Sequence, residues 1–271
     1  MCDTCGCGNP SETRIVKPGQ HHHSHESDHS NEHSHGHDHH HHHELQRREV
    51  IVEQEILNKN QLHAERNRGY FEAKGITVLN LVSSPGSGKT TLVEEIIKLL
   101  GKGTGIYVIE GDQQSTLDAD RIAKLEVPVL QINTGSSCHL EAETVGQAVK
   151  QLNPTKGSLL IIENVGNLMC PSLFDLGENY RIVLLSTAEG EDKPLKYPNM
   201  FDTSHICLIT KMDLLPYTGF NLVKTKENAL LINPRLKIFE LSAKTGDGMK
   251  PFIDWLMSSL SGNRYSIISK K

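Results

Sequence analysis

Short, mostly apolar segments recur from residue 76 to residue 241, and longer stretches with helical spacing separate them. Each segment is apolar at consecutive rather than alternate positions, which is typical of strands buried on both faces of a parallel sheet. Their alternation with helical stretches indicates a three-layer α/β fold. The predicted strands of this mostly parallel sheet are Ile76–Leu81, Ile106–Ile109, Val127–Ile132, Leu159–Ile162, Ile182–Leu185, Ile206–Ile209 and Ile238–Leu241.

The chain before this pattern divides into two zones. Residues 1–20 form a short leader that carries three cysteines, whereas residues 21–44 are a low-complexity tract in which thirteen of the sixteen histidines lie. The composition of the tract cannot bury apolar surface, so we expect it to be disordered unless a metal orders it. Interspersed acids and serines favour a natural tract over a purification tag. The candidate weak metal ligands in it are His21, His22, His23, His39, His40, His41, His42 and His43.

From residue 45 onward the sequence predicts a single globular domain, 45–271. Apolar residues such as Leu45, Ile56 and Leu62 recur at roughly helical spacing, so residues 45–68 are predicted to form an amphipathic helix before the first strand. We find no internal repeat. The domain boundary is therefore expected near residue 45.

Composition and charge exclude several classes of protein. A net charge of −5, a pI near 6.3 and 5% aromatic residues argue against a nucleic-acid binder. No apolar run is long enough for a membrane span, and no secretory signal pattern begins the chain, so we expect a cytoplasmic protein. Cysteines in that compartment are metal ligands, catalytic groups or core residues more often than disulfides. We expect Cys207, inside an apolar run, to be a core residue.

A phosphate-binding loop follows the first predicted strand, in the sequence from Ser83 to Thr90. Gly86 and Gly88 allow the backbone amides to turn toward phosphates, Lys89 can reach the β and γ phosphates, and Thr90 can ligate Mg²⁺. Ser83 replaces the usual first glycine. A chance glycine-rich turn is disfavoured because strand, loop and helix occur in the required order. The predicted phosphate-binding residues are Pro85, Gly86, Ser87, Gly88, Lys89, Thr90 and Thr91.

Carboxylates at the ends of two later strands are candidates for the Mg²⁺ side of this site. Glu163 and Gly166 form a Glu-x-x-Gly version of the usual Asp-x-x-Gly switch, and Asp112 ends the second strand. Either acid could instead be a strand-end residue that only contacts solvent. We assign Lys89, Asp112 and Glu163 as the candidate catalytic residues.

Two further positions concern the rate of hydrolysis. Asn167 stands where many GTPases place a glutamine that orients the attacking water. We therefore expect slow intrinsic turnover. Arg121 is a candidate contributor to the site across a dimer, in the role of an arginine finger.

Guanine recognition is predicted by two segments after later strands. In the Thr-Lys-Met-Asp sequence at 210–213, Asp213 can accept bonds from guanine N1–H and N2–H₂, and the Lys211 stem can pack on the base. The predicted base-binding residues of the second segment, where an amide is available for guanine O6, are Ser242, Ala243 and Lys244. The combination favours GTP over ATP.

Two cysteine-containing groups are candidate metal sites. Cys2, Cys5 and Cys7 place three thiolates within reach of one ion, which suits tetrahedral Zn²⁺ or square-planar Ni²⁺. The alternative is an incidental redox-active tail. The second group consists of Cys138, His139 and Cys170. It lacks one ligand of a tetrahedral site, which water or a second subunit could supply, and its cysteines could instead be ordinary core or surface residues.

Taken together, these motifs closely resemble the HypB family of hydrogenase nickel-incorporation GTPases. The resemblance covers the CDTCGC leader, the histidine tract, SSPGSGKT, EGDQQSTLDADRI, NTGSSCHL, IENVGNLMCP, TKMDLLPY and SAKTGDG. It is similar more distantly to the urease accessory GTPase, which lacks this leader. The resemblance implies a P-loop GTPase with a high-affinity nickel site at the leader cysteines. It also implies an inner Ni²⁺ or Zn²⁺ site at the interface of a GTP-dependent homodimer, and a softer role for the tract as a reserve.

The function that we predict is delivery of nickel to a hydrogenase during maturation, gated by GTP binding and hydrolysis. The resemblance implies a nickel-carrier accessory protein and the hydrogenase large subunit as partners. Two alternatives stay open. A nickel-storage protein would bind several ions per chain, whereas delivery needs one or two. A GTPase that serves urease would differ in its genomic neighbours.

Overall fold

The computed structural model of the protein describes residues 14–17, 42–101, 103–113 and 115–268, with side chains from 53 to 260 apart from the two gaps. The predicted leader site of Cys2, Cys5 and Cys7 and the expected disorder of the tract over 21–41 lie outside the described residues. The last two tract histidines, His42 and His43, belong to the first helix.

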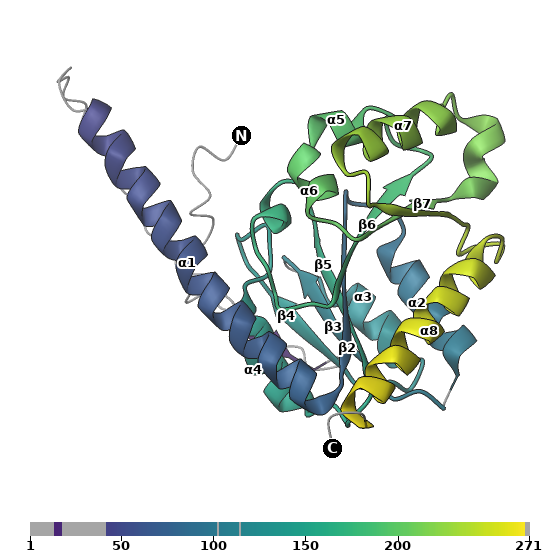
Figure 1. The fold of residues 1–271 in the computed structure, drawn as a ribbon, viewed down its shortest axis with the longest axis horizontal. Coiled ribbons are helices and arrows are strands. Elements are labelled where there is room, and N and C mark those ends of the chain that lie inside the picture. Colours follow the sequence, from purple (N-terminus) through teal and green to yellow (C-terminus); the bar gives the residue numbers. More distant parts are fainter. Residues whose placement is uncertain (1–13, 18–41, 102, 114, 269–271) are drawn as a thin grey trace.

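An eight-stranded sheet forms the centre of the molecule (Figure 1), in the order β1-β4-β3-β5-β2-β6-β7-β8. Strands β2 to β8 are mutually parallel, and β1 pairs antiparallel with β4 at one edge. The strands are β1 (Arg14–Val16), β2 (Thr77–Ser83), β3 (Ile106–Asp112), β4 (Val129–Asn133), β5 (Leu159–Gly166), β6 (Tyr180–Ser186), β7 (Ile206–Thr210) and β8 (Lys237–Glu240).

Helices cover both faces of the sheet, with α2, α3 and α8 on one face and α1 and α4 on the other (Figure 1). The short α5 and α6 lie with α7 near β6 and β7. The helices are α1 (His42–Lys74), α2 (Lys89–Leu100), α3 (Leu117–Ala123), α4 (Ala142–Leu152), α5 (Lys193–Lys196), α6 (Pro198–Asp202), α7 (Leu222–Ile232) and α8 (Met249–Ile268), with short 3₁₀ helices η2 (Cys170–Ser172) and η3 (Met212–Tyr217).

Alternate residues of β2 point to opposite faces of the sheet, and apolar residues pack on both of them. Leu79 and Leu81 join the cluster beneath α2 and α8, whereas Val78 joins the cluster beneath α1 and α4. All seven residues of β2 are buried, as a central parallel strand requires. The predicted three-layer P-loop fold is thus confirmed.

The seven predicted strands are all present, with ends shifted by a few residues. Strand β1 was not predicted, because three residues give no periodic signal. The predicted helix over 45–68 is α1, which begins earlier, at His42, and ends later, at Lys74. Its first part projects beyond the body of the protein (Figure 1).

The burial of Cys207 confirms its prediction as a core residue. Its side chain is 1% exposed among apolar residues of β6 and β7, and burial raises the pKa of its thiol to about 12. None of the helices in the described part of the chain combines the length and hydrophobicity that crossing a bilayer requires.

The carboxyl ends of β2, β3, β5 and β7 meet at one edge of the sheet, because these strands are parallel and near one another. Most of the predicted site residues that the structure describes lie at the ends of these strands, in the loops that follow them or in the first turn of α2. The exceptions are Cys138 and His139, which follow β4, the residues after β8, Arg121 and the two tract histidines. Ligands of open α/β sheets bind at this edge. The site is therefore built from these loops.

Candidate functional site

The loop between β2 and α2 has the conformation that a phosphate-binding loop needs. Gly86 and Gly88 adopt φ angles of +74° and +97°, in the region that favours glycine. The Lys89 ammonium donates to Ser83 Oγ at 3.0 Å. Ser83, where the motif departs from glycine, therefore offers Lys89 a neutral partner that phosphate oxygens can replace.

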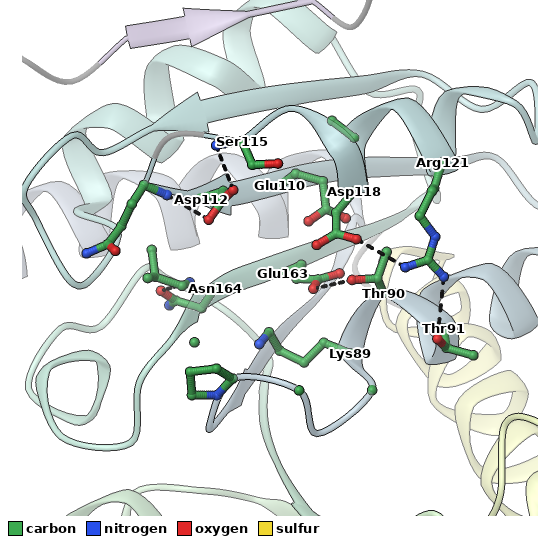
Figure 2. Close-up of a pocket in the computed structure, with 18 of the residues that line it drawn as sticks. Lys89, Thr90, Thr91, Glu110, Asp112, Ser115, Asp118, Arg121, Glu163 and Asn164 are labelled. Atoms are coloured by element: carbon green, nitrogen blue, oxygen red, sulfur yellow. Dashed lines mark hydrogen bonds and ion pairs between the residues drawn. The ribbon is translucent and has the colours of Figure 1, made fainter.

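A cavity of about 540 Å³ opens above this loop, between the ends of β3 and β5 and helix α3 (Figure 2). Its size suits a nucleotide, since ligand pockets span roughly 300–1,000 Å³. The predicted residues that the structure brings together here are Pro85, Gly86, Gly88, Lys89, Thr90, Thr91, Asp112, Glu163, Gly166 and Lys211.

Two buried carboxylates face each other on the floor of this cavity. Glu163 Oε1 accepts a hydrogen bond from the Thr90 hydroxyl at 2.8 Å. Glu163 Oε2 and Glu110 Oε1 are buried and have no hydrogen-bond partner among the described residues. Burial raises the pKa of both carboxyl groups, and the neighbouring charge of Glu163 raises the pKa of Glu110 further. Because Mg²⁺ prefers carboxylate and hydroxyl oxygens, these donors fit that ion.

Glu110 and Asp118 are cavity residues that the sequence reasoning missed. Glu110 precedes Asp112 by two positions on β3, so both point to the same face of the sheet. A glutamate directly after the apolar run Ile106–Ile109 was the available signal. Asp118 has no comparable signal, because an acid in the first turn of a helix is common for electrostatic reasons.

Asp112 lies at the wall of the cavity, and its carboxylate holds the loop after β3. Its two oxygens accept bonds from the amides of Gln113, at 2.8 Å, and Ser115, at 2.9 Å (Figure 2). Its predicted contact with Mg²⁺ or water stays a prediction.

Arg121 and Asn167 have contacts that the sequence did not indicate. The Arg121 guanidinium lines the cavity of its own chain and pairs with Glu94 at 2.9 Å and Asp118 at 3.1 Å. Asn167 Oδ1 accepts from the amide of Met169 at 2.8 Å and caps that turn, and Asn167 is not among the cavity residues. The roles proposed for both stay predictions.

The predicted base-binding segments lie next to the phosphate-binding loop. Lys211 donates to the Gly86 carbonyl at 2.7 Å, and the Thr210 hydroxyl donates to the Ser87 carbonyl at 2.8 Å. Thr210 thus ties β7 to the loop although it replaces the usual asparagine. Asp213 Oδ1 accepts from Ser242 Oγ at 2.6 Å, which brings the two segments together. Ala243 and Lys244 continue the second segment.

A second group of side chains, Cys138, His139 and Cys170, lies beyond the end of β4 and β5. One ligand atom from each lies within 4.8 Å of the others. The two sulfurs are 2.6 Å apart, and Cys138 Sγ is 4.0 Å from His139 Nδ1. Adjacent residues can share this site because they occupy a loop rather than a regular strand. The structure thus brings the three side chains together, and their role as metal ligands stays a prediction.

The surroundings of His139 keep its imidazole neutral, the form that ligates metals. Burial lowers its pKa to about 4. The ring stacks on Phe174 with centroids 3.7 Å apart, and Nε2 is buried with no hydrogen-bond partner in the described part of the chain. Two sulfurs and an imidazole suit a transition metal such as Ni²⁺ or Zn²⁺.

Comparisons with known proteins point to one family. Residues 77–240 match the family model described as CobW/HypB/UreG, nucleotide-binding domain. The hydrogenase maturation factor HypB of Rhizobium leguminosarum bv. viciae is 52% identical over 225 residues, which cover 83% of this chain and 75% of that protein. The hydrogenase/urease maturation factor HypB of Helicobacter pylori (strain ATCC 700392 / 26695) is 39% identical over 226 residues. These residues cover 82% of this chain and 93% of that protein.

The crystal structure of HypB from Helicobacter pylori in complex with nickel has the same fold. Its TM-score is 0.70 at 39% sequence identity, and the match covers 76% of this chain and 96% of that chain. The fold, the family model and the relatives at 52% and 39% identity all point to the same family. The chain belongs to the CobW/HypB/UreG family of P-loop GTPases, as a member of its HypB branch of hydrogenase maturation factors.

Proposed function

We propose that the protein binds and hydrolyses GTP and uses this cycle to deliver nickel to a hydrogenase during maturation. The names of its relatives and the nickel in the Helicobacter pylori structure support this proposal. Under it the domain 45–271 is the GTPase, the leader 1–20 is a tight nickel site, and the tract 21–44 is a reserve.

The nucleotide chemistry follows from the cavity. The loop amides and Lys89 bind the phosphates, and Lys89 exchanges its bond to Ser83 for one to phosphate oxygen. Thr90, Glu163 and Glu110 would hold Mg²⁺, which neutralises charge on the β and γ phosphates when bound. Asp213 selects guanine, because adenine lacks donors that match its carboxylate. The cavity residues thereby position GTP for attack by water.

The inner site holds nickel as cargo. Cys138, His139 and Cys170 supply three ligands, and a GTP-dependent homodimer lets a second chain complete the coordination. Zn²⁺ is the competing ion at such a site. The leader cysteines would supply the ion, and the hydrogenase large subunit or a nickel carrier would receive it.

The observation that carries the proposal is the course of β5, which connects the two sites. Glu163 in this strand bonds to Thr90, and Cys170 follows seven residues later, beside Cys138. Between them Gly166 lies against Pro85 of the phosphate-binding loop. A change at the γ-phosphate can therefore reach a metal ligand through a short stretch of backbone. Ligand positions matter to about 0.2 Å in metal sites.

The proposal is tested by loading the full chain with one Ni²⁺ and mixing it with nickel-free hydrogenase large subunit. Nickel transfer should be fast with GTP and Mg²⁺, and slow with GDP. The Lys89→Ala variant should bind nickel yet transfer it slowly with either nucleotide. Transfer at one rate under all these conditions would contradict the proposal.

Urease is the second candidate acceptor, because the Helicobacter pylori relative is named a hydrogenase/urease maturation factor. The same assay with nickel-free urease separates the two acceptors. Faster GTP-dependent transfer to urease than to hydrogenase would favour it.

A further inference from the structure

A chain of buried polar side chains crosses the face of the sheet that α1 and α4 cover. Asn164 Nδ2 donates to Asn80 Oδ1 at 3.2 Å, and Asn80 Nδ2 donates to Glu178 Oε1 at 3.0 Å. Glu178 Oε1 also accepts from Arg181 Nε at 3.0 Å. These four side chains are between 0% and 5% exposed. Buried polar groups are costly without partners, so each bond in this chain constrains the next.

Asn164, at one end of this series of hydrogen bonds, lies next to both sites. Asn164 follows Glu163 and lines the nucleotide cavity, as Figure 2 shows. Its Oδ1 accepts from the amide of Leu140 at 3.3 Å. Leu140 directly follows His139, so Asn164 holds the loop that presents two of the three metal ligands.

The other end holds the segment that follows the third ligand, Cys170. Arg181 donates to the carbonyl of Ser172 at 3.1 Å and to that of Phe174 at 2.9 Å. The Phe174 ring in turn stacks on His139. Both halves of the metal cluster are therefore attached to the same buried chain of hydrogen bonds.

Within this series of hydrogen bonds, the negative charge of Glu178 is balanced by the positive charge of Arg181. Burial by itself would raise the pKa of Glu178, but the Arg181 guanidinium and the hydrogen bonds from Asn80 and the Leu176 amide outweigh it and lower the pKa to about 2. Glu178 is thus ionised at neutral pH and holds Arg181 in place. Asn80, Glu178 and Arg181 hold one another in place, because rotation of one side chain would leave a buried polar atom of another without its hydrogen bond.

We propose that Asn80 is a positioning residue that couples the nucleotide cavity to the Cys138–His139–Cys170 cluster, by joining Asn164 to the Glu178–Arg181 pair. This inference rests on the proposed function, in which the nucleotide state changes metal binding. Asn80 touches neither the cavity nor a metal ligand, so its replacement removes no direct contact with nucleotide or metal. A displacement of Asn164 at the γ-phosphate moves the Ser172–Phe174 segment through Asn80.

The test compares Ni²⁺ affinity between the GDP form and the form with a non-hydrolysable GTP analogue. It uses the full chain with Cys2, Cys5 and Cys7 replaced by serine as the parent, and the nickel–thiolate absorption band as the readout, to which the histidine tract does not contribute. In the parent we expect the two affinities to differ by roughly 5- to 150-fold, as in typical allosteric coupling. Asn80→Leu and Asn80→Ala should reduce this ratio to within about twofold of unity.

Asn233→Ala is the matched control. Asn233 is also a buried asparagine, with three bonds to the backbone carbonyls of Phe201, Asp202 and Ser204, but it contacts neither site. It should keep the ratio of the parent. Loss of coupling in this control as well would overturn a specific role for Asn80, and so would full coupling in folded Asn80 variants.

Two results separate this inference from the proposed function. Equal affinities in the parent would contradict the proposed function itself, whereas coupling in the parent that survives in the Asn80 variants would contradict only this inference. Nitrogen-15 spectra of the parent give a test that needs no Asn80 variant. Exchange of GDP for the analogue should shift both the Arg181 Nε–H and the Leu140 N–H resonances, and an Arg181 resonance that does not move would overturn the proposal.

Discussion

Gly166 at the end of β5 lies so close to Pro85 of the phosphate-binding loop that a side chain would not fit without movement. A Cβ atom on Gly166 would come within 3.1 Å of Pro85 Cα, Cγ and N. All three atoms belong to the backbone or to the rigid proline ring, so they yield little. The strand that leads to Cys170 is therefore in direct contact with the loop that is predicted to bind phosphate.

Substitution of this glycine should damage nucleotide use more than folding. In Gly166→Ala the added methyl group must displace Pro85 by a few tenths of an ångström, so we expect kcat/KM for GTP to fall about tenfold, a change of about 1.4 kcal/mol. Gly69→Ala is the control, because a methyl group there meets nothing within 4 Å. That helical change should leave hydrolysis intact and raise the free energy of unfolding by about 0.5–1 kcal/mol. Equal kcat/KM in the two variants would contradict the account.

Replacement of Glu110 in the buried carboxylate pair should stabilise the protein and reduce its GTPase activity. In Glu110→Gln the nucleotide-free protein loses an unsatisfied carboxylate with a raised pKa, so its free energy of unfolding at pH 7 should rise by about 1–3 kcal/mol. The same variant should need a higher Mg²⁺ concentration and lose about 100-fold in kcat, the scale typical for a preorganised electrostatic contact. Denaturant unfolding and a Mg²⁺ titration of GTP hydrolysis measure both effects. Wild-type activity in this variant would remove Glu110 from the Mg²⁺ site.

Acid should destabilise the protein through Glu178. Its folded-state pKa of about 2 lies below the unfolded value of about 4.3, so the carboxylate contributes stability that is complete above the unfolded pKa. This contribution, roughly 2–3 kcal/mol, is lost as pH falls from about 5 to 2. Urea unfolding between pH 7 and pH 3 measures the loss. Glu178→Gln, which leaves Arg181 without its charged partner, should be less stable at pH 7 and show a flatter pH dependence over this range.

Base selection should depend on Asp213. Replacement by asparagine substitutes a donor for one acceptor that guanine needs, so the preference for GTP over ATP should fall by about 10- to 100-fold in kcat/KM. Asp254→Asn is a control on the exposed face of α8, where the native side chain pairs with Lys250 at 2.6 Å. It should keep the preference of the wild type. Equal use of ATP and GTP by the unmodified protein would contradict the assignment of a guanine site.

Local patterns predicted much of the fold and of the nucleotide site. Seven strands and the candidate phosphate-binding segment 85–91 follow from consecutive apolar runs and glycine spacing, which act within a few residues. The chain from Asn164 through Asn80 to Glu178 could not be predicted, because it depends on pairing between residues 84 and 98 positions apart. Strand β1 was missed for a similar reason, since its three residues are stabilised by pairing with distant β4.

The candidate metal ligands were easier to identify from the sequence than the residues around them. Cysteine and histidine beside turns are uncommon enough to be noticed, and Cys138 and Cys170 do lie together. Asn167 shows the opposite case. Its amide could have faced water in the cavity, but it caps the turn before Cys170 because Met169 offers an amide two residues away. Competition of this kind between local and distant partners is decided only by the folded geometry.

The central claim is that the nucleotide state controls the metal site formed by Cys138, His139 and Cys170. The most direct measurement is titration of Ni²⁺ and Zn²⁺ into the chain that lacks the leader thiols, with GDP and with a non-hydrolysable GTP analogue, together with sedimentation to follow dimerisation. The account predicts a dimer with the analogue and metal affinities that differ between the two states by about 1–3 kcal/mol. Identical affinities and identical dimerisation in both states would contradict it and leave these residues a structural role.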